Sequence, residues 1–163
     1  AASAFGGTPP YVFDWNGFDP NALSSGTYNI TVTVGSNSAA ADNSIIQTLT
    51  GSSNTTTVNV GTSAASGDAD IDLVATGDSN TVTINENSTA TMIGDDKKVT
   101  SITLSGSSNT VTSTHTGAGD HDTTLAHTGS SGTFSITQGG AHDGTSSITT
   151  VGSGHSVTVT MDD

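Results

Sequence analysis

The sequence contains no cysteine and only two basic residues, Lys97 and Lys98. The absence of cysteine excludes disulfides, thiolate metal sites and cysteine nucleophiles. Nucleic acids and anionic membranes are bound through Lys and Arg, whereas this chain has 15 acidic residues and a formal net charge of −13. No apolar run approaches the roughly 18 residues of a membrane-spanning helix. Neither nucleic acid nor a membrane is therefore expected as a partner.

Aromatic residues and prolines are also scarce, and most of them lie at one end of the chain. All three prolines and every aromatic residue except Phe134 fall within the first 28 positions. Only 31% of the residues are apolar, against roughly 45–50% in a typical soluble domain by a count that includes glycine. We expect no large core. We expect residues 1–43 to form an aromatic docking or capping segment with a first strand at 27–34, ahead of a repeat domain at 44–163.

Ser, Thr, Gly and Asn are abundant, and they form a turn cassette that returns along the chain. Its copies are Gly51-Ser-Ser-Asn54, Gly77-Asp-Ser-Asn80, Gly106-Ser-Ser-Asn109, Gly129-Ser-Ser-Gly132 and Gly152-Ser-Gly-His155. The last three glycines are 23 residues apart, and the earlier gaps are 26 and 29 residues. A period of this size indicates a solenoid or an array. Glycine adopts the positive φ that tight turns need, and Asn tolerates it next best.

Aligned on these glycines, the last three units show matching columns two residues apart, as alternation across a pleated strand requires. The columns are Ile102, Leu125 and Ile148; Val111, Phe134 and Val157; and Ser113, Ile136 and Val159. Each unit is predicted to be a strand, a turn, a second strand and a looser return. Stacked identical columns favour an all-β fold, a β-solenoid of about five coils with a period of about 23 residues. An antiparallel meander of hairpins is the alternative, although it does not require identical columns.

Two units resemble the curlin repeat, the unit of bacterial extracellular fibre proteins related to curli major subunits. The matching segments are Gly77-x-x-Asn80-x-Val82-x-Ile84 and Gly106-x-x-Asn109-x-Val111, and a third unit keeps the final glutamine at Gln138. Elsewhere the Gln138 column holds Val60, Glu86, His115 and Met161. The repeats are also similar to Ser-, Asn- and Thr-rich repeats in structural proteins of tailed phages. The first resemblance implies a fibre subunit, and the second implies a virion component.

The end coils of a solenoid carry unpaired backbone groups that can template another chain. We expect the last unit, with Val157, Val159 and Met161, to be uncapped and to dock onto the aromatic segment of a second copy. The aromatic anchors expected there are Tyr11, Phe13, Trp15 and Phe18. A head-to-tail contact of this kind need not close, so it builds a filament. The alternative role of the aromatic residues is a plug over the first coil.

The expected function is therefore structural: a secreted, self-assembling subunit of an extracellular filament, with no catalytic activity. The start at Ala1 fits cleavage of a signal peptide after a small residue, and a trimmed chain fits equally well. The second hypothesis is a phage decoration or fibre protein whose N-terminus binds a viral capsid protein. The third is an adhesin or carbohydrate-binding module that uses Trp15 or Tyr11 as a stacking platform.

Residues with site chemistry are few, and no nucleophile elbow or phosphate-binding loop occurs. His121-Asp122 and His142-Asp143 fall at nearly the same place in successive units and could bind a divalent metal. Aspartates in the turns could hold Ca²⁺. Solvated surface charge is the alternative for both groups, and no cofactor is expected. His127 occupies an inward column and is expected to be a hydrogen-bonded interior histidine.

Overall fold

The computed structural model describes residues 27, 29–34, 43–60, 69–87, 97–117, 120–140 and 144–162. This part of the chain consists of strands and turns, and none of it is a helix that could cross a membrane. The strands are β1 (Asn29–Val34), β2 (Asn43–Thr50), β3 (Thr55–Val60), β4 (Ala69–Thr76), β5 (Thr81–Asn87), β6 (Lys97–Ser105), β7 (Thr110–Thr116), β8 (Asp120–Thr128), β9 (Thr133–Gly139), β10 (Gly144–Val151) and β11 (Ser156–Asp162).

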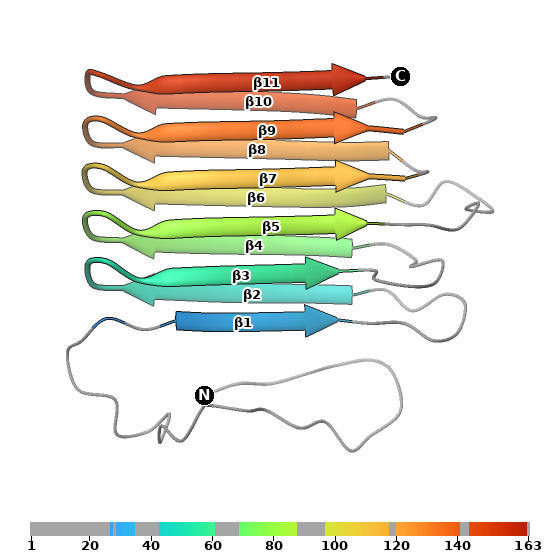
Figure 1. Cartoon of the computed structure of the whole chain (residues 1–163), viewed down its shortest axis with the longest axis horizontal. Helices are drawn as coiled ribbons and strands as arrows, with labels where there is room; N and C mark the ends of the chain where they lie inside the picture. Colours follow the sequence, from blue (N-terminus) through green and yellow to red (C-terminus); the bar gives the residue numbers. More distant parts are fainter. Residues whose placement is uncertain are drawn as a thin grey trace, which may run out of the picture.

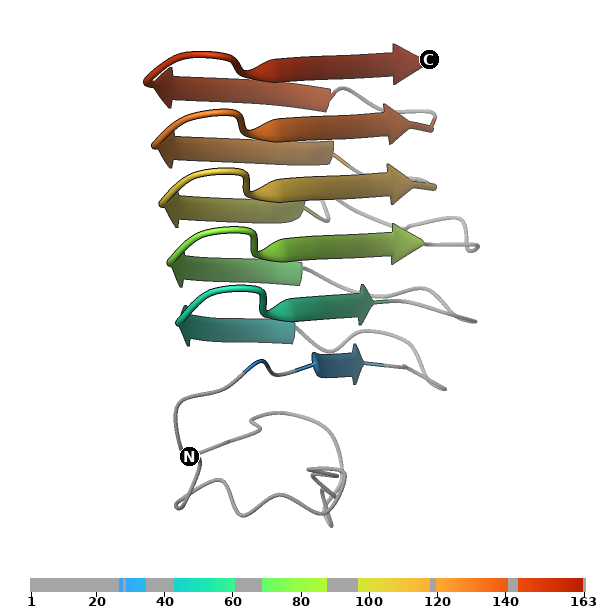
Figure 2. The same ribbon diagram turned by 60° about the vertical axis from the view of Figure 1, so that its left-hand side comes forward.

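The strands form two parallel sheets that face each other. One sheet has six strands in the order β1-β3-β5-β7-β9-β11, and the other has five in the order β10-β8-β6-β4-β2. Each strand–turn–strand unit therefore gives one strand to each sheet. Successive units stack on one another as the coils of a solenoid (Figures 1 and 2). The chain is a β-solenoid, as predicted. A hairpin meander is wrong because every pairing between neighbouring strands is parallel.

The strand register agrees with the glycine spacing. Asn80 is hydrogen-bonded to Asn54, 26 residues earlier, and to Asn109, 29 residues later. In the last two units the hydrogen-bonded residues at this position are Gly132 and His155, which are 23 residues apart. The predicted columns are confirmed, since Leu125 pairs with both Ile102 and Ile148. Because strands and turns differ little in length, the extra residues of the longer steps fall in the returns after β3 and β5. Those returns lie outside the described residues.

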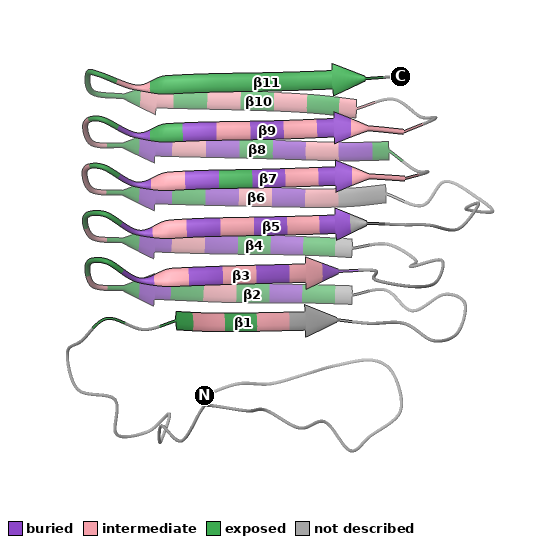
Figure 3. Cartoon of the chain, viewed as in Figure 1, coloured by how far each residue is buried: buried purple, intermediate pink, exposed green. Residues whose placement is uncertain are grey.

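The core is a thin layer between the two sheets. Along β3 and β9 buried residues alternate with more exposed ones, so each strand turns one face inward (Figure 3). The buried apolar residues form columns such as the one with Val58, Ile84 and Ile136 on one sheet and the one with Leu73, Ile102 and Leu125 on the other. The residues between the columns are mostly Thr and Ser and face outward, with Ile46 and Val151 as exposed apolar exceptions. The interior is narrow, as the low apolar content predicts.

The predicted first strand is β1, which pairs in parallel with β3. The rest of the segment expected at 1–43 lies largely outside the described residues, and so do Tyr11, Phe13, Trp15 and Phe18. The division between a docking segment at 1–43 and a repeat domain at 44–163 stays a prediction.

Candidate functional site

The turn glycines form a column in which each coil touches the next through its backbone. All five, Gly51, Gly77, Gly106, Gly129 and Gly152, have positive φ. A Cβ on Gly106 would overlap the carbonyl oxygen of Gly77, and the same overlap recurs at each step up the column. Glycine is therefore required at this position twice over, by its φ and by the close approach of the neighbouring coil.

The asparagines of the cassette hold the coils together by hydrogen bonds instead of adopting positive φ. The left-handed residue is the serine before each of them, as at Ser79 (φ 58°) and Ser108 (φ 59°). Asn54 N–H donates to Asn80 Oδ1 at 2.9 Å, and Asn80 N–H donates to Asn109 Oδ1 at 2.8 Å. These side chains are buried. Each amide thus supplies an acceptor to the coil below, which fixes the register at the turn.

The ladder changes character where the cassette loses its asparagine. Gly132 replaces Asn, and a Cβ at that position would overlap the ring of Phe134, which fills the space. One coil further on, His155 Nδ1 accepts from Gly132 N–H at 3.2 Å. An imidazole nitrogen therefore replaces the amide oxygen. His127 packs against this group, with 4.9 Å between its ring centroid and that of Phe134 and the two rings tilted by 56°.

His127 is an interior, hydrogen-bonded histidine, as predicted. It is 1% exposed, and its Nε2–H donates to the carbonyl oxygen of Gly106 at 2.9 Å. Burial lowers its pKa below the usual 6.5; the bond to Gly106 opposes this shift, and the nearby His155 adds to it. The ring is therefore held in its neutral form.

The last coil exposes the side chains that inner coils bury. Val157, Val159 and Met161 are 46%, 43% and 51% exposed. Their partners one coil below, Phe134, Ile136 and Gln138, are at most 3% exposed. The whole of β11 is exposed along its length (Figure 3). An unpaired strand edge thus coincides with an uncovered end of the core.

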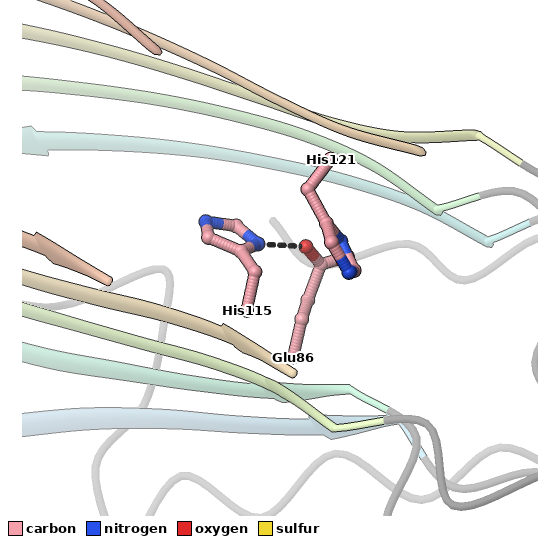
Figure 4. Close-up of side chains that lie close together, drawn as sticks. All are labelled: Glu86, His115 and His121. Atoms are coloured by element: carbon pink, nitrogen blue, oxygen red, sulfur yellow. Dashed lines mark hydrogen bonds and ion pairs between the residues drawn. The ribbon is translucent and has the colours of Figure 1, made fainter. Parts of the chain in front are cut away.

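A second group of unusual side chains is buried inside the stack. Glu86 on β5, His115 on β7 and His121 on β8 come from three successive coils and from both sheets. Glu86 Oε2 bonds His115 Nδ1, and the carboxylate lies between the two imidazole rings (Figure 4). All three residues are at most 1% exposed.

Ser113 Oγ lies 2.7 Å from His115 Nε2, so a hydroxyl, an imidazole and a carboxylate follow one another as in a hydrolase relay. The hydroxyl is completely buried, however, and a substrate carbonyl has no access to it. Thr123 Oγ1 also bonds His115 Nε2, at 3.1 Å, and Gln138 Nε2 donates to Thr123 Oγ1 at 3.1 Å. The arrangement is a hydrogen-bonded network within the core.

The metal site suggested for His121-Asp122 and His142-Asp143 stays a prediction, and His121 and Asp122 are the pair that the structure describes. The two residues are neighbours on β8 and point to opposite faces, so His121 is buried while Asp122 is half-buried. His142 and Asp143 lie outside the described residues. His121 instead meets Glu86 and His115. The sequence held part of this signal, because Glu86 and His115 occupy the Gln138 column.

The aspartates considered as calcium ligands do not form a cluster within the described ranges. The one group of three metal-binding side chains found there is Glu86, His115 and His121. Calcium prefers six to eight oxygen ligands, and this group has a single carboxylate.

In comparisons with known proteins, no protein-family model, curated protein or solved structure matches the chain.

Proposed function

We propose that the chain is a structural subunit that stacks head to tail into a filament outside the cell. The carrying observation is the last coil, whose inward columns are intact and uncovered. Burying three apolar side chains that are each about half exposed favours association, since removal of apolar surface from water contributes roughly 25 cal/mol per Å². The resemblance to curlin repeats supports the same proposal.

The strand that fits this surface is β1 of a second copy. By register, Ile30 lies in the column of Val157 and Val32 in the column of Val159. Both β1 and β11 are end strands of the six-stranded sheet, and a copy translated along the stack brings them together in parallel. The filament would then continue the same columns across each junction.

The unequal sheets predict a further feature of this junction. Pairing β11 with the next β1 leaves β10 and the next β2 two strand spacings apart, about 9.6 Å, because among the described strands the five-stranded sheet has no counterpart of β1. We propose that the aromatic residues Tyr11, Phe13, Trp15 and Phe18, which precede β1 in the sequence, anchor the contact beside that gap.

Negative-stain microscopy and sedimentation at increasing protein concentration test the assembly. We expect unbranched filaments, with a fibre-diffraction spacing of about 4.8 Å along the fibre axis from stacked strands. Persistent monomers or closed trimers at every concentration would rule out the filament and favour a virion component whose N-terminus contacts a capsid protein.

A matched pair of substitutions on β11 tests the contact surface. Val159→Asp places a carboxylate in an inward column, where a docked coil would bury it without a partner. Thr158→Asp adds the same charge to the same strand on its outer face. We expect the first variant to remain folded and monomeric and the second to assemble. Equal assembly by both would contradict the proposed junction.

Deletion of residues 1–26 tests the aromatic anchor separately. We expect the shortened chain to keep its solenoid, as measured by circular dichroism, and to assemble poorly because each junction would lack the aromatic residues that anchor it. Undiminished assembly would show that the aromatic segment is not part of the contact.

A further inference from the structure

The buried cluster of Glu86, His115 and His121 has the donor atoms of a transition-metal site. One ligand atom from each residue lies within 4.8 Å of the other two. The imidazole centroids are 5.7 Å apart and tilted by 41°, with the carboxylate between them (Figure 4). Two imidazole nitrogens and one carboxylate oxygen form a common ligand set for Zn²⁺, with a fourth position for water.

The carboxylate of Glu86 is costly to bury in its present surroundings. Its Oε2 bonds His115, but its Oε1 has no hydrogen-bond partner among the described residues. Buried polar atoms are almost always paired, and a buried charge needs an opposite charge or a metal. A divalent ion at this point would satisfy the carboxylate and draw on the lone pairs of both rings.

The surroundings of the two histidines also suit metal binding. His115 Nδ1 faces Glu86, while its Nε2 is held by Ser113 Oγ at 2.7 Å and by Thr123 Oγ1 at 3.1 Å. His121 Nε2 lies 3.4 Å from the carbonyl oxygen of Gly117. A histidine that binds a metal through one nitrogen typically donates its other N–H to an oxygen of this kind, which orients the ring. Both rings have such an oxygen in place.

A glutamine on β9, in the same coil as His121, positions these hydrogen-bond partners. Gln138 Nε2 donates to the carbonyl oxygen of His121 at 2.9 Å and to Thr123 Oγ1 at 3.1 Å. One amide therefore positions both the backbone of His121 and a hydroxyl that contacts His115. The cluster is therefore held by hydrogen bonds from its own three coils.

We propose that Glu86, His115 and His121 bind one divalent first-row transition metal, with Zn²⁺ as the representative ion, inside the solenoid. The nitrogen-rich donor set favours such an ion over Ca²⁺ or Mg²⁺. The ligands come from three successive coils and from both sheets. The bound ion therefore joins these coils at their return ends, opposite the turn cassettes. Metal binding then contributes to folding.

Metal content after folding is the direct test, since a buried site fills most readily as the chain folds. The full chain is refolded with ZnCl₂ or with EDTA, freed of unbound metal, and analysed by mass spectrometry for zinc. We expect one Zn²⁺ per chain and a higher melting temperature for the zinc-loaded form. Co²⁺ should give the visible absorption of a four-coordinate site. Absence of retained metal would overturn the proposal.

Substitutions identify the ligands. Glu86→Gln and His115→Gln place an amide where the column already accommodates Gln138, so both should fold. Each removes a direct ligand and should weaken zinc binding by more than the roughly 10–100-fold loss that follows removal of an outer partner. His127→Leu is the control: it removes a buried imidazole about 20 Å along β8, at a position where the column also has Leu104.

Full zinc retention by either glutamine variant, or an equal loss in His127→Leu, would contradict the assignment. X-ray absorption of the zinc-loaded natural chain gives a result that does not depend on variants folding. Two imidazole ligands and one carboxylate are expected there, and a shell of oxygen alone would overturn the site. Filament formation is measured separately, since the metal site does not depend on it.

Discussion

The two ends of each coil follow opposite rules. At the turn end the same residues recur in unit after unit, with glycine in all five cassettes and asparagine in three. At the return end one column holds a different residue on every coil: Val60, Glu86, His115, Gln138 and Met161. In the turn column neighbouring coils meet through the glycine backbone, whereas the return column is filled by side chains; Gly140 and Gly117 add a backbone contact at the return end.

This difference separates the part of the repeat that sets register from the part that can vary. A backbone contact tolerates no added atom, so the turn column is restricted to glycine. Side chains in the return column project into the core between the sheets, where size and polarity can differ if partners are present. The buried carboxylate of Glu86, with His115 and His121, lies at this return end.

Gly106→Ala should have the largest effect on this contrast. The substitution forces a residue with a side chain to φ 123° and drives its Cβ into the Gly77 carbonyl, so we expect a loss of at least about 3 kcal/mol in unfolding free energy. Gly139→Ala at the return end is the control, since the nearest atom to its added Cβ would be 3.6 Å away. Chemical denaturation compares the two, and equal stabilities would refute the backbone-contact rule.

Asn80→Ala should cost somewhat less, about 2 kcal/mol, because it leaves the buried N–H of Asn54 without its acceptor. Asn85→Ala is the matched control on β5, the strand that follows Asn80. Asn85 is half-buried on the outer face and donates to Asn59 at 2.9 Å. If denaturation shows the same loss for both, the inner ladder has no special role in the register.

Gly132 stands where three other cassettes have asparagine, and a double-mutant cycle with Phe134 tests why. Gly132→Asn alone should destabilise by roughly 1–3 kcal/mol, because its side chain meets the Phe134 ring. Phe134→Val restores the valine found at Val82 and Val111 in the same column and makes room for the amide. We expect a favourable coupling of about 1 kcal/mol between the two changes. Additive effects would show that ring and amide do not compete for one space.

A small pH effect is expected at His127. Its lowered pKa means that the folded chain binds this proton less readily than the unfolded chain, so its contribution to stability is complete above pH 6.5 and is lost as the pH falls through the folded value. Unfolding free energies between roughly pH 8 and pH 5 should fall less steeply for His127→Leu than for the natural chain. Identical slopes would contradict this role.

Much of the fold could be predicted because register in a stacked repeat follows from residue spacing. The columns through Leu125, Phe134 and Ile136, the interior position of His127 and the solenoid itself all followed from the glycine steps. Which turn residue takes the left-handed conformation could not be predicted in the same way. Both Ser and Asn are common turn residues, and only the backbone shows that serine takes the left-handed position while asparagine forms the ladder.

The sequence by itself determined which residues share a column, because a parallel ladder places every residue over its equivalent one coil away. It placed Glu86 and His115 together in this way. Only the tertiary structure decided that His121, on the opposite sheet, meets them, because contacts across the core depend on how two sheets face each other. The exposure of Val157, Val159 and Met161 was likewise decided by the stack, since the same column position is buried in an inner coil and uncovered in the last.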